Sequence, residues 1–264
     1  MRTTSNGAAT LAWDERGEGR PLLLVMGHRF SSAMWHWALE GLSAQARVVW
    51  FDNRGTGQSN TPPGPYAMRA LAEDAFAVMD AAGLKSASVY GVSMGGMIAQ
   101  EMALAAPDRV DSLILGCTAA RYPGARPPHP ATHLQYWLPR RLVLGLSRGL
   151  LYGPAAKANR IAQDLKLLQA DRSDPRGLVG QAHAIAGFNA LDRLSEIRQP
   201  TLVLHGSHDR VFPVAMAEEL AAGIADSRLV VLEGAGHNYV ADVTDASNAA
   251  VLDFLKSLDA TGGR

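Results

Sequence analysis

Short runs of consecutive apolar residues alternate along the chain with longer stretches that carry apolar residues every three or four positions. Such runs, rich in Val and Leu, are typical of strands buried between helices on both faces of a parallel sheet. They occupy residues 21–26, 47–51, 87–91, 112–116, 201–205 and 228–232. Helical spacing predicts helices at 67–82, 94–106, 215–222 and 245–258. This alternation indicates right-handed β–α–β crossovers and an α/β fold with a mostly parallel sheet.

The segment Ala9–Arg16 differs from these runs because apolar and polar residues alternate along it. It ends in Gly17-Glu18-Gly19, a composition typical of a turn. We therefore expect this segment to form an antiparallel hairpin at the edge of the sheet, paired with the first buried strand at 21–26.

The strand–helix alternation stops between about Thr118 and Leu194, where helical patterns continue without a convincing strand. A proline-rich stretch at 122–130 is followed by helical patterns at 134–151, 155–170 and 175–188. A loop of about 75 residues would be exceptional. We interpret 119–194 as a helical cap inserted into a core formed by 1–118 and 195–264. The alternative is that some of these helices are ordinary crossover helices.

Charge and cysteine content exclude several classes of protein. Among 264 residues, 25 basic and 25 acidic residues give a formal net charge of zero, so nothing favours nucleic acid or an anionic membrane as a partner. The single cysteine, Cys117, excludes an internal disulfide and a cysteine-based zinc site. The first residues lack an apolar signal core, which predicts a soluble cytoplasmic protein.

The segment Gly91-Val92-Ser93-Met94-Gly95 matches the pattern G-x-S-x-G between a predicted strand and a predicted helix. A sharp strand-to-helix turn needs glycines two positions before and after its central residue, because a Cβ there would clash as the chain doubles back. The turn raises the Ser93 hydroxyl above the sheet, and the start of the next helix favours negative charge beside it. Ser93 is therefore a candidate nucleophile.

A nucleophilic serine needs a base, and the base needs an acid to orient it. Here the chain resembles the α/β-hydrolase family, whose catalytic residues follow the order serine, acid, histidine. The resemblance covers nearly the whole chain and is weakest in 119–194. It implies Asp209 as the acid, in His205-Gly-Ser-His-Asp209, and His237 as the base, in Gly234-Ala-Gly-His237. Some family members place the acid after the strand at 112–116, but Cys117 follows it here, without a carboxylate nearby.

The same resemblance implies two backbone donors for the oxyanion. One is the N–H of Met94, directly after the candidate nucleophile. The other lies where the family usually carries H-G-x-x; here the sequence is Met26-Gly27-His28-Arg29, which implies the N–H of His28. A side-chain change at Met26 leaves that backbone donor intact. The side chains of His28 and Arg29 are expected near the entrance, lining it or facing solvent.

Side chains from the cap region are candidates for substrate contacts. Trp137 and Phe188 either line an apolar pocket or pack in the helical region. Arg140 and Arg141 are adjacent, so both cannot face a pocket if they lie on one helix. We expect both to face solvent and the substrate to be neutral, apolar and of medium size. The alternative is that one of them, or Arg29, pairs with a substrate carboxylate.

The resemblance implies a serine hydrolase that cleaves a carboxylic ester or a lactone through an acyl-enzyme and needs no metal or cofactor. Three alternatives remain: hydrolysis of a C–C bond in a β-diketone-like ring-cleavage product, cofactor-free haloperoxidase activity, and a non-catalytic ligand receptor on the same fold. The chain contains neither a P-loop motif nor a strand-linked dinucleotide fingerprint. Ser93 also excludes relatives of this fold that place aspartate at the nucleophile position.

Overall fold

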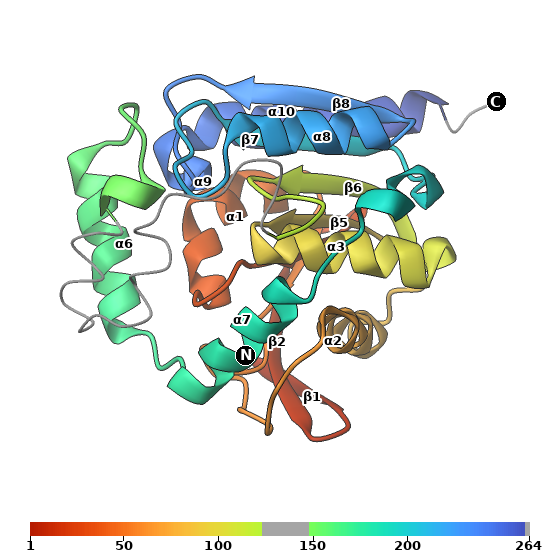
Figure 1. The fold of residues 1–264 in the computed structure, drawn as a ribbon, viewed down its shortest axis with the longest axis vertical. Helices are drawn as coiled ribbons and strands as arrows, with labels where there is room; N and C mark the ends of the chain where they lie inside the picture. The colour runs from red at the N-terminus through yellow and green to blue at the C-terminus, as the bar shows by residue number, and fades with distance from the viewer. Residues whose placement is uncertain (123–147, 262–264) are drawn as a thin grey trace.

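The computed structural model describes residues 1–122 and 148–261, and it confirms the predicted α/β fold (Figure 1). A sheet of eight strands in the order β1-β2-β4-β3-β5-β6-β7-β8 crosses the molecule. β1 and β2 are antiparallel to their neighbours, and the other strands pair in parallel. The strands are β1 (Arg2–Asn6), β2 (Ala9–Arg16), β3 (Pro21–Val25), β4 (Arg47–Phe51), β5 (Ala87–Val92), β6 (Val110–Gly116), β7 (Thr201–Gly206) and β8 (Ser227–Leu232). The six predicted buried strands thus agree with β3 to β8 within two residues.

Helices cover both faces of the sheet (Figure 1). On one face α2 (Met68–Ala81) packs on α3 (Met94–Ala105), and α8 (Val214–Gly223) packs on β7 and β8. On the other face α1 (His36–Ser43) contacts α9 (Tyr239–Asp242) and α10 (Thr244–Thr261). Short 3-10 helices complete these layers: η1 (Ser32–Trp35), η2 (Pro107–Arg109) and η3 (Leu191–Glu196).

The alternation of side chains along each strand divides the core between the two faces. In β3, Leu23 and Val25 belong to the cluster under α2, α3 and α8, whereas Leu22 and Leu24 belong to the cluster under α1 and α10. All four side chains are fully buried. A strand with apolar side chains on both faces needs helices on both sides, which explains the continuous apolar run in the sequence.

The prediction for residues 9–16 is wrong in its partner. β2 pairs with β1 and β4 rather than with β3, and β1 forms the edge of the sheet. The connection after β2 passes closely over the end of α1, since a Cβ at Gly17 would lie 2.3 Å from the carbonyl oxygens of Ser43 and Ala46. This path carries the chain past β4, so β4 lies between the two strands expected to form a hairpin.

The region between β6 and β7 contains α6 (Ala158–Ala170) and α7 (Pro175–Ala186), as the helical patterns predicted. Helix α6 contacts η1 and α9, and Asp174 caps α7 by accepting the Arg176 N–H at 2.8 Å. Most of the predicted helix at 134–151 lies outside the described residues, and the division into core and cap stays a prediction. Across residues 1–122 and 148–261, no helix has both the length and the apolar content that crossing a bilayer requires.

Candidate active site

Ser93 occupies the turn between β5 and α3, with backbone angles φ 58° and ψ −122°. A non-glycine residue at positive φ is strained, and such strain is common at functional sites. A Cβ at Gly91 would lie 2.1 Å from the Gly95 carbonyl oxygen, and one at Gly95 would lie 2.0 Å from the Val25 carbonyl oxygen. The two glycines are therefore required by close backbone approach, as the motif predicted.

The two backbone segments that the family resemblance implies as oxyanion donors both adjoin Ser93. Met94 is the first residue of α3, so its N–H has no acceptor within that helix. The loop after β3 passes directly against Ser93, since a Cβ at Gly27 would lie 2.9 Å from the Ser93 Cβ. Further along, the Asp52 carboxylate accepts the Ser32 N–H and hydroxyl, each at 2.7 Å. The loop at 27–32 is thus fixed beside Ser93.

Asp209 and His237 form a buried hydrogen-bonded pair. The His237 ring donates from Nδ1 to Asp209 Oδ2 at 2.8 Å, and Asp209 Oδ1 accepts the Val211 and Phe212 N–H groups at 2.7 and 2.9 Å. Burial raises the pKa of the Asp209 carboxyl, but the His237 ring and these hydrogen bonds lower it more, and the net shift is downward. Asp209 is therefore a carboxylate that can orient the imidazole.

A chain of contacts joins this pair to the Ser93 turn. The Ser93 N–H donates to the Gly116 carbonyl at 2.8 Å, and the next residue, Cys117, places its Sγ 3.8 Å from the Gly236 carbonyl oxygen. Gly236 directly precedes His237. The carboxyl ends of β5, β6, β7 and β8 therefore bring the three sequence-predicted residues to one edge of the sheet.

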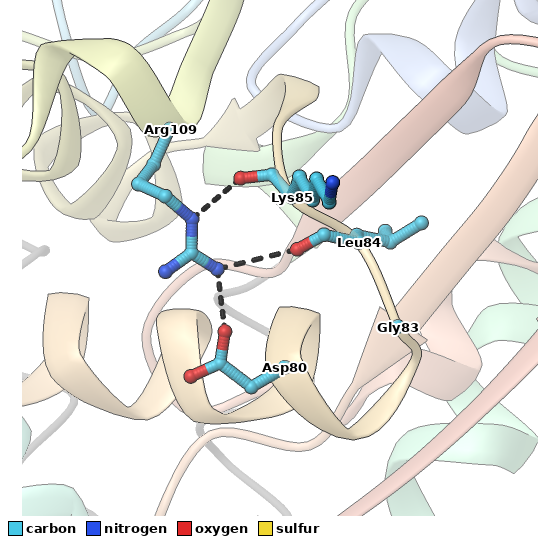
Figure 2. Close-up of a pocket in the computed structure, with 5 residues that line it drawn as sticks. All are labelled: Asp80, Gly83, Leu84, Lys85 and Arg109. Carbon is cyan, nitrogen blue, oxygen red and sulfur yellow. Dashed lines mark hydrogen bonds and ion pairs between the residues drawn. The ribbon is translucent and has the colours of Figure 1, made fainter.

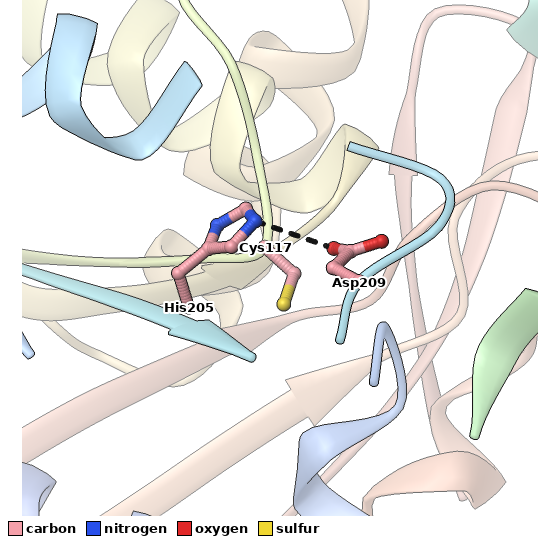
Figure 3. A group of neighbouring side chains, drawn as sticks. All are labelled: Cys117, His205 and Asp209. Carbon is pink, nitrogen blue, oxygen red and sulfur yellow. Dashed lines mark ion pairs between the residues drawn. The ribbon is translucent and has the colours of Figure 1, made fainter. Parts of the chain in front are cut away.

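Cys117, His205 and Asp209 converge at this edge, and their potential ligand atoms lie within 4.8 Å of one another (Figure 3). The chemistry does not fit a metal. His205 donates from Nε2 to the Phe212 carbonyl at 2.8 Å, so this nitrogen has no lone pair for a metal. The Cys117 Sγ already accepts the Gly206 N–H at 3.4 Å, and the Asp209 carboxylate already accepts from His237, Val211 and Phe212. The cluster is better understood as packing around the Asp209 carboxylate.

Comparison with known proteins decides the family. A family model described as the alpha/beta hydrolase fold matches residues 20–242, which include Ser93, Asp209 and His237. The chain belongs to the α/β-hydrolase fold family. This confirms the resemblance drawn from the sequence motifs and supports a hydrolase activity.

Relatives of this α/β hydrolase differ in the reactions for which they are named. The chain is 30% identical over 272 residues to RutD of Azorhizobium caulinodans, named as a candidate carbamate hydrolase, covering 98% of this chain and 100% of the relative. It resembles a solved thermophilic esterase of Thermogutta terrifontis with a TM-score of 0.84 and 28% identity, covering 97% of each chain. It also resembles the enol-lactonase of Burkholderia xenovorans LB400, with a TM-score of 0.85 and 25% identity, covering 97% of this chain and 100% of the enzyme.

Other predicted site residues of the α/β hydrolase have different surroundings. Arg29 has a positive φ of 74°, and its N–H donates to Gln181 Oε1 at 3.2 Å. Phe188 is buried in the core cluster that contains α2 and α3, and its role in a pocket stays a prediction. Trp137 lies outside the described residues, as do Arg140 and Arg141.

A surface depression of the α/β hydrolase lies before the amino ends of β5 and β6. It is lined by Asp80, Gly83, Leu84, Lys85 and Arg109 (Figure 2). The Arg109 guanidinium donates to the Lys85 carbonyl at 2.6 Å, the Leu84 carbonyl at 3.3 Å and Asp80 Oδ1 at 2.6 Å. These residues precede β5 and β6, so they lie at the amino ends of the strands. Arg109 therefore fixes a turn on the edge opposite Ser93.

Two buried carboxylates lie around the turn Gly234–His237, called the histidine turn below, and neither was identified from the sequence. Asp242 Oδ2 accepts the N–H groups of Gly236 and Gly153 at 2.7 and 2.8 Å. Asp164, on α6, is fully buried and accepts four donors, from His36, Trp37, Tyr152 and Asn238. The only sequence signal for Asp242 is a charged residue within an otherwise apolar stretch shortly after His237. Both carboxylates hold the histidine turn against the segment that leads into α6.

Proposed function

We propose that this α/β hydrolase is a serine hydrolase that cleaves a carboxylic ester or a lactone through an acyl-enzyme on Ser93. The observation that carries the proposal is the 2.8 Å bond between His237 Nδ1 and Asp209. A carboxylate accepts only, so the bond supports a ring proton on Nδ1 and an Nε2 lone pair that accepts the Ser93 proton in the proposed reaction.

In the proposed reaction, Ser93 Oγ attacks the acyl carbon while His237 Nε2 takes the hydroxyl proton. The N–H groups of Met94 and His28 stabilise the negative oxygen of the tetrahedral intermediate. His237 then protonates the leaving alcohol as the bond to it breaks. Water attacks the acyl carbon with His237 again as base, the bond to Ser93 Oγ breaks as His237 passes the proton to Oγ, and the acid product leaves. Each step uses only groups of this chain and water.

Carbamate hydrolysis is a second candidate, favoured by the 30% identity to RutD over nearly the full length of both proteins. A carbamate also presents a carbonyl carbon to a nucleophile, so the same residues would act on it. We place it second because the nitrogen lone pair makes a carbamate carbonyl less electrophilic than an ester carbonyl. Hydrolysis of a C–C bond, haloperoxidase activity and ligand binding without catalysis stay alternatives.

We further propose that the preferred substrate is neutral, with an apolar acyl or ring portion. A carboxylate in a buried pocket needs a cationic partner, because an unpaired buried charge is costly. Of the three arginines considered from the sequence, Arg29 lies within the described residues, and its backbone N–H donates to Gln181 on α7. Preference for an anionic substrate that disappears in Arg29→Ala would contradict the neutral-substrate proposal.

The test is a panel of kcat/KM values for matched aryl esters, lactones and aryl carbamates, each in a neutral and a carboxylate-bearing form. Ser93→Ala is the control for each substrate. We expect Ser93-dependent turnover with at least tenfold preference for a neutral ester or lactone over the carbamate. A tenfold preference for the carbamate would make that the function instead. Turnover that persists in Ser93→Ala would contradict the nucleophile.

A further inference from the structure

The loop after β3 is held by helix α7 as well as by the sheet. His28, whose N–H is the proposed oxyanion donor, hydrogen-bonds through its ring Nε2 to the Leu178 carbonyl oxygen at 3.0 Å. The next N–H, of Arg29, donates to Gln181 Oε1 at 3.2 Å. Leu178 and Gln181 are three residues apart on α7 and therefore lie on one face of that helix. One face of α7 thus forms hydrogen bonds with two successive residues of the loop.

The Gln181 side chain has a single orientation that satisfies its partners. It is fully buried, and its Nε2 donates to the Arg54 carbonyl at 2.9 Å. A carbonyl oxygen can only accept, so the amide nitrogen must face Arg54 and the amide oxygen must face the Arg29 N–H. Gln181 therefore connects the loop after β3 to the loop after β4.

Close packing fixes the position of α7 above these loops. A Cβ at Gly55 would lie 2.5 Å from the Gly177 Cα, and a Cβ at Gly180 would lie 2.6 Å from the Tyr66 ring. Backbone and ring approach this closely only because both positions are glycine. The helix therefore provides a rigid anchor for the loop.

The loop needs such an anchor at Arg29. Its φ of 74° lies in the left-handed region, which is strained for a residue other than glycine. Without the Gln181 bond, the chain would relax toward negative φ and rotate the neighbouring peptides. Because Arg29 follows His28 directly, and Gly27 before it packs against Ser93, this relaxation would change the direction of the His28 N–H.

We propose that Gln181 and the imidazole of His28 are positioning residues that anchor the loop after β3, residues 27–32, to α7. The anchored loop directs the His28 N–H toward the developing oxyanion. This role rests on the proposed function of Ser93. In this role both side chains act through the backbone of the loop and not on the substrate. Burial lowers the pKa of His28 to about 4, so the ring is neutral near pH 7 and the proton on Nε2 is the one given to Leu178.

The test compares Gln181→Met with Gln199→Met in the full-length protein. Gln199 is a matched control: it is also buried, and its side chain bonds backbone groups of Pro107 and Arg198, before the amino end of β7. Each variant is measured for kcat and KM on an ester, for thermal stability, and for the rate of phosphonylation of Ser93 by a fluorophosphonate. In that reaction the Oγ–P bond forms, fluoride leaves and the proton passes to His237.

Removing one oxyanion donor costs about 10²–10³ in kcat, so misplacing one is expected to cost about tenfold to a hundredfold. Gln181→Met should lower kcat and the phosphonylation rate by that factor while KM changes less than about threefold. Gln199→Met should change neither rate. His28→Phe removes the other anchor and should show the same pattern. Because both residues hold one loop, the double variant should lose less than the product of the single losses.

Equal kcat and phosphonylation rates in Gln181→Met and Gln199→Met would overturn the anchoring role while leaving the Ser93 nucleophile intact. A loss confined to KM would overturn it as well. If Gln181→Met does not fold, His28→Phe against Gln199→Met decides the question by the same criteria. Wild-type protein that is not phosphonylated at Ser93 would instead refute the proposed function on which the inference rests.

Discussion

Replacing Asp209 by Asn is expected to force the His237 ring into the wrong tautomer. Asp209 Oδ1 accepts two backbone N–H groups, from Val211 and Phe212, and Oδ2 accepts His237 Nδ1–H. In the variant, the amide oxygen must stay with the two backbone donors, so the amide NH₂ faces His237 Nδ1. That nitrogen then becomes an acceptor, and the ring proton moves to Nε2, where it blocks proton transfer from Ser93.

The size of the effect follows from the cost of turning the amide around. The opposite orientation would leave two buried N–H groups facing NH₂, at about 1–3 kcal/mol each, or roughly 4 kcal/mol together. Each 1.4 kcal/mol is about a factor of ten, so the productive tautomer falls to about 10⁻³ of the population. Losing the charge that stabilises the protonated ring lowers the rate further. We expect kcat to fall by about 10³–10⁴.

The assay is ester hydrolysis under saturating substrate, with far-ultraviolet circular dichroism to show that the variant is folded. Asp111→Asn is the matched control, because Asp111 is exposed near the amino end of β6 and should keep wild-type kcat. A folded Asp209→Asn protein with kcat within tenfold of wild type would refute this reasoning and place the acid elsewhere.

Two further predictions concern the packing around the histidine turn. Tyr90 and Tyr239 bond through their hydroxyls at 2.6 Å, so either single change to Phe should lower the free energy of unfolding by about 1–3 kcal/mol, and the double change should cost less than the sum. Urea unfolding measures this, and additive losses would contradict it. Burial raises the pKa of Asp242 from 3.8 to about 6, so its contribution to stability is present below about pH 4 and lost as pH rises through 6. Asp242→Asn keeps an acceptor for the Gly153 and Gly236 N–H groups and does not titrate. The free energy of unfolding of the variant minus that of wild type should therefore rise by about 2–3 kcal/mol from pH 4 to pH 7.5. If the difference in the free energy of unfolding between variant and wild type is the same at both pH values, the pKa of the Asp242 carboxyl is not raised.

The buried strands were predictable because their burial is local in sequence. In β3, four consecutive apolar side chains are buried, and no amphipathic helix would need that pattern. β1 was not predictable, because Arg-Thr-Thr-Ser-Asn carries no apolar face and becomes a strand only by pairing with β2. The position of β2 next to β4 depends on the path of the Gly17 turn, which the residue pattern does not encode.

In the candidate site, too, features encoded by local sequence were predictable and contacts between distant segments were not. The positions of Ser93, Asp209 and His237 were predictable because each lies in a short motif after a strand, where local backbone geometry dictates the neighbouring residues. The contacts of Gln181 with Arg29 and of Asp164 with His36 were not, because each of these pairs is separated by more than 120 residues in the chain. No spacing marks such residues, and only the packed helices show what they hold.

The central claim is that Ser93 is an activated nucleophile, and its direct test is reaction with a fluorophosphonate followed by intact mass measurement and peptide mapping. The account predicts one adduct, located on Ser93, that is absent in Ser93→Ala and forms far more slowly in His237→Ala. Folded wild-type protein that acquires no adduct, or acquires it on another residue, would contradict the account.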